Sequence, residues 1–396
     1  MDGLTNNIFV FIVCGTSEHI DTLHYSLKYL THFSKNRIVV LTDSSRNEIA
    51  INHTDIIDIQ TPPAYDHHQA SIYLKTGVYK FLPKGNNYCY LDTDVLALDP
   101  EVDLIFNDFL PPIRFAKDHS PMDVFSPHAI NCSCLAIFNQ RSDELQTLIK
   151  KYDPNLEIRK RYSKEQDKLL HLLNTEKSFL NKTLQSIRYK LSPSIFKLDN
   201  YYLDKQKGVW FLPANNEAIL YNFQVIKKDI EDNSEFIWKE EEKRWYWQGK
   251  LKLDIPKCSH LQEQIETSFK ISVRNSHWNH WNGGVFLFND ESHQFLESWH
   301  QKTLAIFELD EWKTRDQGTL IATVWEWGLE NHPYLDKQWN FIANYYNEQL
   351  HLKGINTFSD DNWETEHNVA LIHVFHHFGD PTWPIWNQVN KILPHD

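Results

Sequence analysis

Two aspartates separated by a single residue, Asp92 and Asp94, are the side chains whose spacing points most directly to chemistry. They follow the apolar run from Tyr88 to Leu91 and precede Val95 and Leu96. If the chain turns after a buried strand, both carboxylates can reach one Mn²⁺ or Mg²⁺ ion, whose other ligands would be a substrate diphosphate and water. The cation would neutralise charge on a departing nucleoside diphosphate. The alternative is a pair of solvated aspartates at a strand end.

Three histidines near the C-terminus, His373, His376 and His377, are candidates for a third metal ligand. Neutral imidazole binds Mn²⁺, and a terminal loop can bring it to the aspartates. Alternation along a strand would put His373 and His377 on one face. The competing interpretation is that most of these histidines are polar residues at a strand end that contact backbone.

Asp316 comes just before the apolar-periodic stretch from Thr319 to Trp327. It could hydrogen-bond a hydroxyl group of a bound substrate, or it could be the N-cap of that helix. Upstream, the segment from His277 to Trp281 alternates histidine and tryptophan and suits the stacking of an acceptor sugar, although core packing of a tryptophan competes with that use. Asn282 follows as a hydrogen-bonding group, and the next two glycines permit close backbone approach.

Alternating strands and helices in the first hundred residues would position these groups. Apolar runs predict strands at 8–13, 37–42, 56–59 and 88–91, and helical spacing predicts a helix over 70–82. Further on, strands are expected at 285–289 and 370–375 and helices at 295–307 and 319–327. This order predicts an α/β fold with a mostly parallel central sheet flanked by helices. Ligands of such sheets lie at the carboxyl ends of strands, where Gly15 and Asp92 both fall.

The bulk composition is that of an ordinary globular protein. The chain has 396 residues, of which 41% are hydrophobic and 23% charged. Its net charge of -13 argues against nucleic acid as a partner, because non-specific binding depends on Lys and Arg. The apolar run from Ile8 to Cys14 is too short for a signal peptide or a membrane span. We therefore expect a cytoplasmic protein with no integral membrane segment.

The five cysteines are odd in number and lie mostly in apolar runs, which favours reduced thiols over a disulfide framework. Cys132 and Cys134 have C-x-C spacing without a second pair, which argues against a zinc site.

Residues 140–257 carry mixed charged clusters and fit the strand–helix alternation poorly, so an insertion or accessory lobe is expected there. The whole chain, 1–396, is expected to form a single domain that includes this insertion, with a nucleotide-sugar and metal-binding half at 1–125. An acceptor-side half at 270–396 would include the C-terminal metal-ligand segment.

The sequence resembles the metal-dependent glycosyltransferases of the GT-A fold, and most closely the glycogenin-like class, glycosyltransferase family 8. The matching motifs occur in the family's order and cover roughly the first 120 and the last 130 residues. They are Val13–Thr16, Lys75, Asp92 with Asp94, Phe115–Asp118, Asn282–Val285, Asp316–Gln317, and His376 with Gly379.

The resemblance implies transfer of a sugar from a nucleotide-sugar donor, a UDP-sugar by preference, to a hydroxyl of a carbohydrate or glycoconjugate acceptor, with retained configuration. It implies that the metal ligands are Asp92, Asp94 and His376, with Mn²⁺ or Mg²⁺ as the ion. It places Asp316, Gln317 and Asn282 in the catalytic centre. The donor-binding residues would be Cys14, Gly15, Thr16, Lys75, Asp92, Thr93, Asp118 and Gly379.

The sequence departs from the family at its end. The usual Lys-Pro-Trp after the glycine is replaced by the run from Asp380 to Pro384, so the lysine that would contact the diphosphate is missing. Lys75 is the candidate substitute. Two other functions stay open: a nucleotidyltransferase, although Cys14-Gly15-Thr16-Ser17 is not the glycine-rich loop expected of one, and a non-catalytic carbohydrate-binding protein on a transferase fold.

Overall fold

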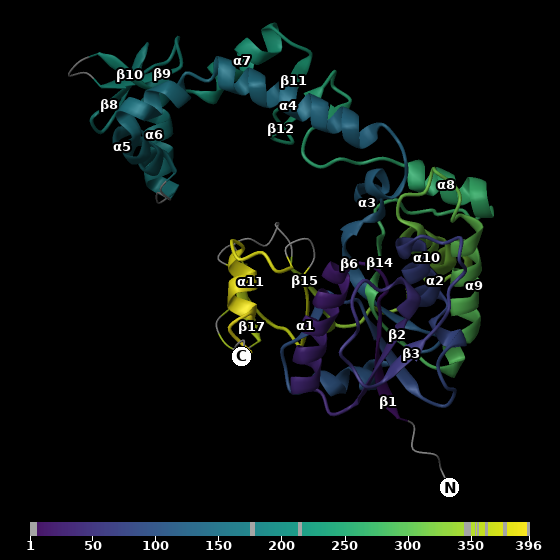
Figure 1. Cartoon of the computed structure of the whole chain (residues 1–396). Helices are drawn as coiled ribbons and strands as arrows, with labels where there is room; N and C mark the ends of the chain where they lie inside the picture. Colours follow the sequence, from purple (N-terminus) through teal and green to yellow (C-terminus); the bar gives the residue numbers. More distant parts are fainter. Residues whose placement is uncertain are drawn as a thin grey trace. The chain divides into compact units, whose positions relative to one another are not determined.

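The computed structural model describes residues 6–174, 179–212, 216–343, 350–352, 354, 356–360, 363–374 and 378–393. These form two compact units. The first unit combines Met1–Cys132 with Lys257–Asp396, and the second is the continuous segment Ser133–Pro256 between them. Figure 1 shows both units coloured along the sequence.

A six-stranded sheet forms the centre of the first unit, with the order β3-β2-β1-β4-β14-β6. Strands β1, β2, β3 and β4 are parallel, and β14 runs antiparallel to both of its neighbours. The strands are β1 (Asn7–Ile12), β2 (Arg37–Thr42), β3 (Ile56–Asp58), β4 (Asn87–Leu91), β6 (Arg114–Pro121) and β14 (Asn279–Phe288). The predicted α/β fold with a mostly parallel central sheet is confirmed.

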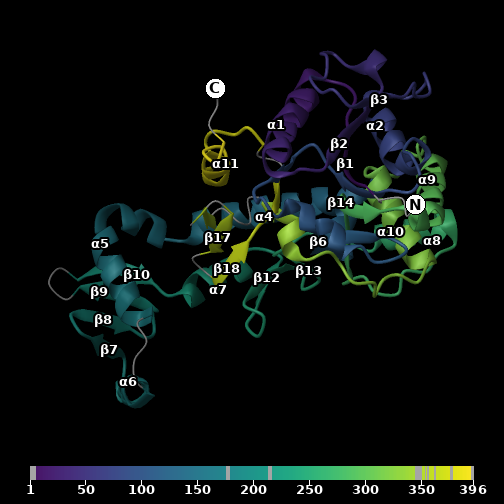
Figure 2. The same cartoon turned by 90° about the horizontal axis from the view of Figure 1, so that it is seen from below.

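The centre of the sheet is buried on both faces, which explains why β1, β2 and β4 are almost continuously apolar. In β1, Ile8, Val10 and Ile12 pack into one core, whereas Phe9 and Phe11 pack into the core on the opposite face. The first core is covered by α2 (His67–Thr76), α8 (His260–Phe269), α9 (His293–Ala305) and α10 (Arg315–Glu326), and the second by α1 (Ser17–Phe33). Figure 2 shows α1 and α9 on opposite sides of the sheet strands.

A second, three-stranded sheet lies where the two aspartates leave the central sheet. Its order is β15-β19-β5, with β15 (Phe341–Ala343) parallel and β5 (Val95–Ala97) antiparallel to β19 (Leu371–Val374). The chain therefore turns between β4 and β5 and pairs with a strand from near the C-terminus. That pairing brings two distant parts of the sequence together at one point.

The remaining elements of the first unit are short. They are α3 (Met122–Ala129), the three-stranded sheet of β16 (Leu350–Leu352), β17 (Thr357–Asp360) and β18 (Trp363–Asn368), α11 (Pro384–Val389), and the 3-10 turns Ser44–Arg46, Val78–Lys80, Val102–Asp108, Asp290–Ser292 and Lys337–Trp339. The helix predicted over 70–82 starts earlier and stops earlier. It begins at His67, directly after the N-cap Asp66, which forms a capping box with Gln69 in the first turn, and it ends at Thr76 before Gly77.

The second unit has two apolar clusters of its own. One includes Leu169, Phe196 and Trp210, and the other includes Ile230 and Phe236. Its elements are α4 (Cys134–Tyr152), α5 (Asn155–Asn174), α6 (Phe179–Leu191), the antiparallel sheet β7 (Ile195–Leu198), β8 (Tyr201–Asp204), β9 (Val209–Leu212), β10 (Glu217–Tyr221), then α7 (Phe223–Asp232) and the small sheet β11 (Phe236–Lys239), β12 (Arg244–Trp247), β13 (Leu251–Lys252).

Within the described parts of the chain, none of the helices combines the length and the apolar character that crossing a bilayer requires.

Candidate active site

Asp92, Asp94 and His373 meet at the turn between β4 and β5. One ligand atom from each of the three side chains lies within 4.8 Å of the others. The backbone holds this arrangement, because the Asp92 N–H donates to the Gly284 carbonyl at 2.8 Å and the Val374 N–H donates to the Asp94 carbonyl at 2.9 Å. The Nε2 atom of His373 is 3.2 Å from Oδ1 of Asp94. Two carboxylates and an imidazole are a suitable ligand set for Mn²⁺.

Lys75, on α2, lies between two carboxylates of this site. Its Nζ is 3.1 Å from Oδ1 of Asp92 and 3.2 Å from Oδ2 of Asp316. Burial disfavours the charged amine, but the two carboxylates outweigh it and raise the pKa of Lys75 above its ordinary value. Lys75 is therefore a fixed positive charge beside the aspartate pair.

Two carboxylates of the site, Asp94 and Asp316, are held ionised by their neighbours. Burial would raise the pKa of Asp94, but His373 outweighs burial and lowers it. In return, the pKa of His373 is raised by Asp94 against the effect of its own burial. Asp316 is likewise buried, and Lys75 lowers its pKa. Three carboxylates against one lysine leave a negative site that a divalent cation would complement.

A chain of hydrogen bonds positions His373 from behind. Its Nδ1 is 3.1 Å from Oδ1 of Asn340, and Nδ2 of Asn340 donates to Oδ1 of Asn282 at 3.2 Å. Nδ2 of Asn282 donates in turn to Oδ2 of Asp118 at 2.9 Å. Such outer contacts fix the ring orientation of a metal-ligating histidine and leave Nε2 for the ion.

Gly284 is the point of closest packing in the site. A Cβ at this position would lie 2.6 Å from Cε1 of His373, 2.9 Å from Oδ1 of Asn282 and 3.0 Å from Oδ2 of Asp92. The absence of a side chain therefore lets β14 approach the metal-ligand candidates. The neighbouring Gly283 donates its N–H to Oε1 of Gln317 at 3.0 Å, which ties α10 to the same strand.

Several side chains named from the sequence gather here: Lys75, Asp92, Asp94, Asn282, Asp316 and Gln317. The suggestion that Asp316 is the N-cap of α10 is wrong, because Thr314 occupies that position and Asp316 lies in the first helical turn. Its side chain is free of the capping role and pairs with Lys75 instead.

The suggested sugar-stacking use of Trp278 and Trp281 is also wrong. Their exposed fractions are 7% and 1%, and both belong to the core beneath the sheet. His280 is fully buried as well, and only His277 of this group is exposed. An acceptor sugar would have to stack on other residues.

The predicted donor-binding loop, Cys14 to Thr16, follows β1. Because Phe11 pairs with Leu91, this loop and Asp92 leave the sheet at the same edge. Gly15 has a φ of 124°, which only glycine adopts readily, and its N–H donates to Oδ1 of Asn47 at 3.2 Å. Cys14 is buried, and its thiol lies 3.1 Å from Oγ of Ser71, so its side chain faces the protein interior.

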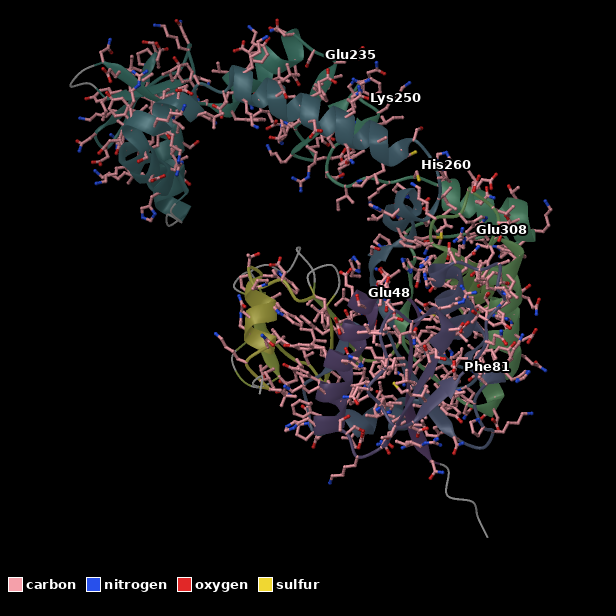
Figure 3. All side chains as sticks on the ribbon, in the orientation of Figure 1. Glu48, Phe81, Glu235, Lys250, His260 and Glu308 are labelled. Carbon is pink, nitrogen blue, oxygen red and sulfur yellow. The ribbon has the colours of Figure 1, made fainter. Side chains whose placement is uncertain are left out.

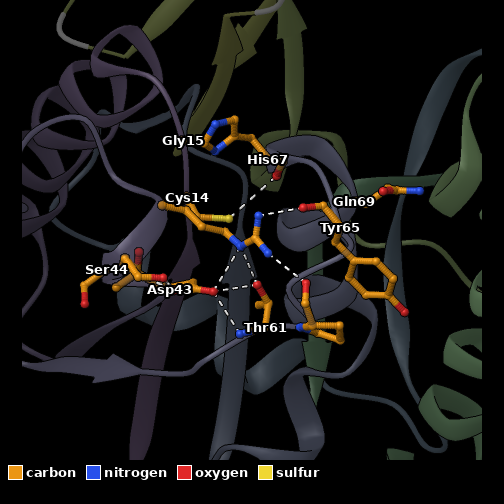
Figure 4. A network of polar contacts seen from close by, with 12 residues as sticks. Cys14, Gly15, Asp43, Ser44, Thr61, Tyr65, His67 and Gln69 are labelled. Carbon is orange, nitrogen blue, oxygen red and sulfur yellow. Dashed lines mark hydrogen bonds and ion pairs between the residues drawn. The ribbon is translucent and has the colours of Figure 1, made fainter.

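A second loop, after β2, is held rigid below the first (Figure 4). Asp43 accepts from the Thr61 N–H at 2.8 Å and from Nε of Arg46 at 3.1 Å. Arg46 also donates to the carbonyls of Tyr65 and Pro62. The hydrogen bonds that the Asp43 carboxylate accepts from Ser45, Thr61 and Arg46 outweigh the effect of burial and lower the pKa of Asp43 to about 2. The loop is a fixed wall beside the expected nucleotide site.

The other predicted site residues have different surroundings. Asp118 is buried and accepts a hydrogen bond from Nδ2 of Asn282. The backbone carbonyl of Thr93 accepts a hydrogen bond from Oγ of Ser26. Gly379 is exposed with a φ of 78°. The predicted metal ligand His376 lies outside the described residues.

From the sequence, His373 is one of three candidates for the third ligand, but the resemblance favours His376, and Asn340 is missed. His373 was considered only as one of three clustered histidines, and nothing near Asn340 in the sequence signals a functional position. The available signal for His373 was the cluster of histidines itself, because all four residues of β19 are buried and alternation does not mark one face of the strand.

No protein-family model matches the sequence, and no curated protein matches it at a significant level. Mouse xyloside xylosyltransferase 1, apo form, is similar in structure, with 12% identity, a TM-score of 0.39, and 94% of this chain and 99% of that chain covered. The galactosyltransferase LgtC, in complex with donor and acceptor sugar analogues, has 12% identity, a TM-score of 0.41 and coverage of 97% and 94%. At TM-scores this low the likeness carries no argument about function, and the functional assignment rests on the residues of the site.

Proposed function

We propose that this chain is a metal-dependent glycosyltransferase that transfers a sugar from a nucleoside-diphosphate sugar to a hydroxyl acceptor. The observation that carries the proposal is the meeting of Asp92, Asp94 and His373 at the carboxyl end of a buried parallel strand. That edge of an α/β sheet is where nucleotide ligands bind. The three side chains would hold Mn²⁺ or Mg²⁺, which when bound stabilises negative charge on the leaving diphosphate.

The protein's own residues supply the other tasks. Lys75 is a buried positive charge next to Asp92 and is the candidate replacement for the lysine missing after Gly379. Its position suits an ion pair with a donor phosphate. Asp316 and Gln317 stand at the start of α10 beside the glycines of β14, where they would contact the donor sugar or orient the acceptor.

The finer assignments rest on the resemblance to glycosyltransferase family 8. They are a UDP-sugar donor, retention of anomeric configuration, and a contribution of His376 to the metal shell. The same proposal assigns residues 1–125 to donor and metal binding and 270–396 to the acceptor and the last metal ligand. The lobe between them would serve as an accessory.

The test is a nucleotide-release assay with a panel of UDP- and GDP-sugars in Mn²⁺ or in EDTA. We expect release of a nucleoside diphosphate that requires the metal and is lost in Asp94→Ala. Asp21→Ala is the matched control, because Asp21 is an exposed aspartate on α1 whose loss leaves the site unchanged. Formation of a nucleoside triphosphate and a sugar 1-phosphate when pyrophosphate is added to the nucleotide sugar would instead identify a nucleotidyltransferase. Metal-dependent donor binding without turnover on any acceptor would favour a carbohydrate-binding protein.

A further inference from the structure

A second group of metal-ligating side chains lies in the first unit, at the two places where the chain leaves it and returns. Cys132 ends the first segment, and Cys258 and His260 begin the second. One ligand atom of each lies within 4.8 Å of the others. The sequence shows no second pair of metal ligands near Cys132 and Cys134. The fold, however, brings Cys258 and His260, which have C-x-H spacing, close to Cys132.

The spacing of the sulfur atoms fits a metal better than a disulfide. Sγ of Cys132 and Sγ of Cys258 are 3.9 Å apart. Zinc–sulfur bonds of about 2.3 Å at the tetrahedral angle give a sulfur–sulfur distance of about 3.8 Å. A disulfide bond requires about 2.05 Å.

The two segments are held in place by α3 and its neighbours. Oγ of Ser126 lies 3.1 Å from Sγ of Cys258 and accepts from the Leu261 N–H at 2.9 Å. The Cys258 N–H donates to the Asp123 carbonyl at 3.0 Å. A serine hydroxyl beside the sulfur is the kind of outer contact that supports a thiolate ligand. The protein itself therefore positions the cysteine–histidine group.

We propose that Cys132, Cys258 and His260 of the first unit bind a Zn²⁺ ion. Two thiolates and one imidazole are a ligand set that zinc takes, with the fourth position left to water. Thiolates select zinc, whereas the two carboxylates and one imidazole near β4 suit Mn²⁺ or Mg²⁺. The ion ties the end of the first segment to the start of the second. Figure 3 labels His260, the first residue of α8.

The site is tested by metal analysis of the full chain carrying Asp94→Ala, which removes zinc bound near β4 from the count. After purification without chelator, we expect about one zinc per chain. Adding Cys258→Ser should lower that content at least tenfold, while adding Cys89→Ala, which removes a thiol buried in β4, should leave it unchanged. Equal zinc in the Cys258→Ser and Cys89→Ala chains would overturn the proposal.

A second measurement keeps the test decisive if Cys258→Ser fails to fold. A mercurial added to the Asp94→Ala chain should release zinc as it consumes thiols, and Co²⁺ in place of zinc should give a thiolate charge-transfer absorption. A chain without zinc whose Co²⁺ form lacks that band would refute the site, as would a Cys132–Cys258 disulfide found by peptide mass spectrometry without reduction. None of these readouts depends on glycosyl transfer.

Discussion

Replacing Gly284 with alanine tests the metal centre through geometry alone. The new Cβ would lie 2.6 Å from Cε1 of His373, whereas ordinary contacts begin at 3.4 Å, so His373 or β14 must move by about 0.8 Å. The same methyl group would also press on Asp92. The φ angle of Gly284 is not in the positive region, so its backbone conformation suits alanine. The substitution therefore adds crowding without backbone strain.

The expected consequence is loss of metal binding and of turnover in a folded protein. A misplacement of about 1 Å at a reacting centre costs on the order of a hundredfold in rate. We therefore expect Gly284→Ala to reduce metal-dependent nucleotide release by on the order of a hundredfold and to weaken Mn²⁺ binding, measured by the electron paramagnetic resonance of free Mn²⁺.

Gly283→Ala is the matched control on the same strand. Its Cβ would meet Oε1 of Gln317 at 3.1 Å, which is the flexible end of a side chain, and it would not contact Asp92 or His373 within the nearest atoms. We expect Mn²⁺ affinity close to that of the wild type. If Gly284→Ala binds Mn²⁺ as tightly as Gly283→Ala while both are folded by circular dichroism, the assignment of His373 and Asp92 to one metal is incorrect.

Three further predictions concern charges. Burial lowers the pKa of His300 to about 4, below the unfolded value of 6.5, so its neutral form stabilises the fold above pH 6.5 and that stability is lost as the pH falls toward 4. The loss should be on the order of 3 kcal/mol in urea unfolding and smaller in His300→Gln. The pKa of Asp43 is about 2, below its ordinary 3.8, so its ionised form stabilises the fold above pH 3.8 and this contribution disappears as the pH falls through 2. Asp43→Asn should therefore lower the free energy of unfolding at neutral pH by about 2 kcal/mol. Lys75→Met leaves Asp92 and Asp316 without their shared cation and should cost about 3 kcal/mol, and Mn²⁺ should raise the melting temperature more in this variant than in the wild type. An equal Mn²⁺ effect in both proteins would contradict the charge argument.

The central sheet was largely predictable because its signal is local. Strands β1, β2 and β4 are apolar runs buried on both faces, and such runs are visible without knowledge of their partners. The position of β14 was not predictable. Its insertion between β4 and β6, antiparallel to both, depends on contacts between residues far apart in the sequence.

The residues of the candidate site also differ in how far the sequence could predict them. Asp92 and Asp94 are close in sequence and are recognised by their spacing. His373 lies beside them only because the chain leaves the central sheet after β4, and β5 then pairs with β19. All four residues of β19 are buried, so no alternation of polar and apolar residues marks one face of this strand. The approach of Cys258 and His260 to Cys132 was not predicted either, because it depends on contacts between residues far apart in the sequence.

The closeness of Cys132 to Cys258 has an evolutionary consequence. The segment between them leaves the first unit and returns at nearly the same point, as the 3.9 Å between the two sulfur atoms shows. A stretch of chain with adjoining ends can be acquired, exchanged or deleted without opening the sheet that hosts it. A chain without this segment would need only a short turn between α3 and α8, and selection could change residues 133–256 at a different pace from the residues beside β4.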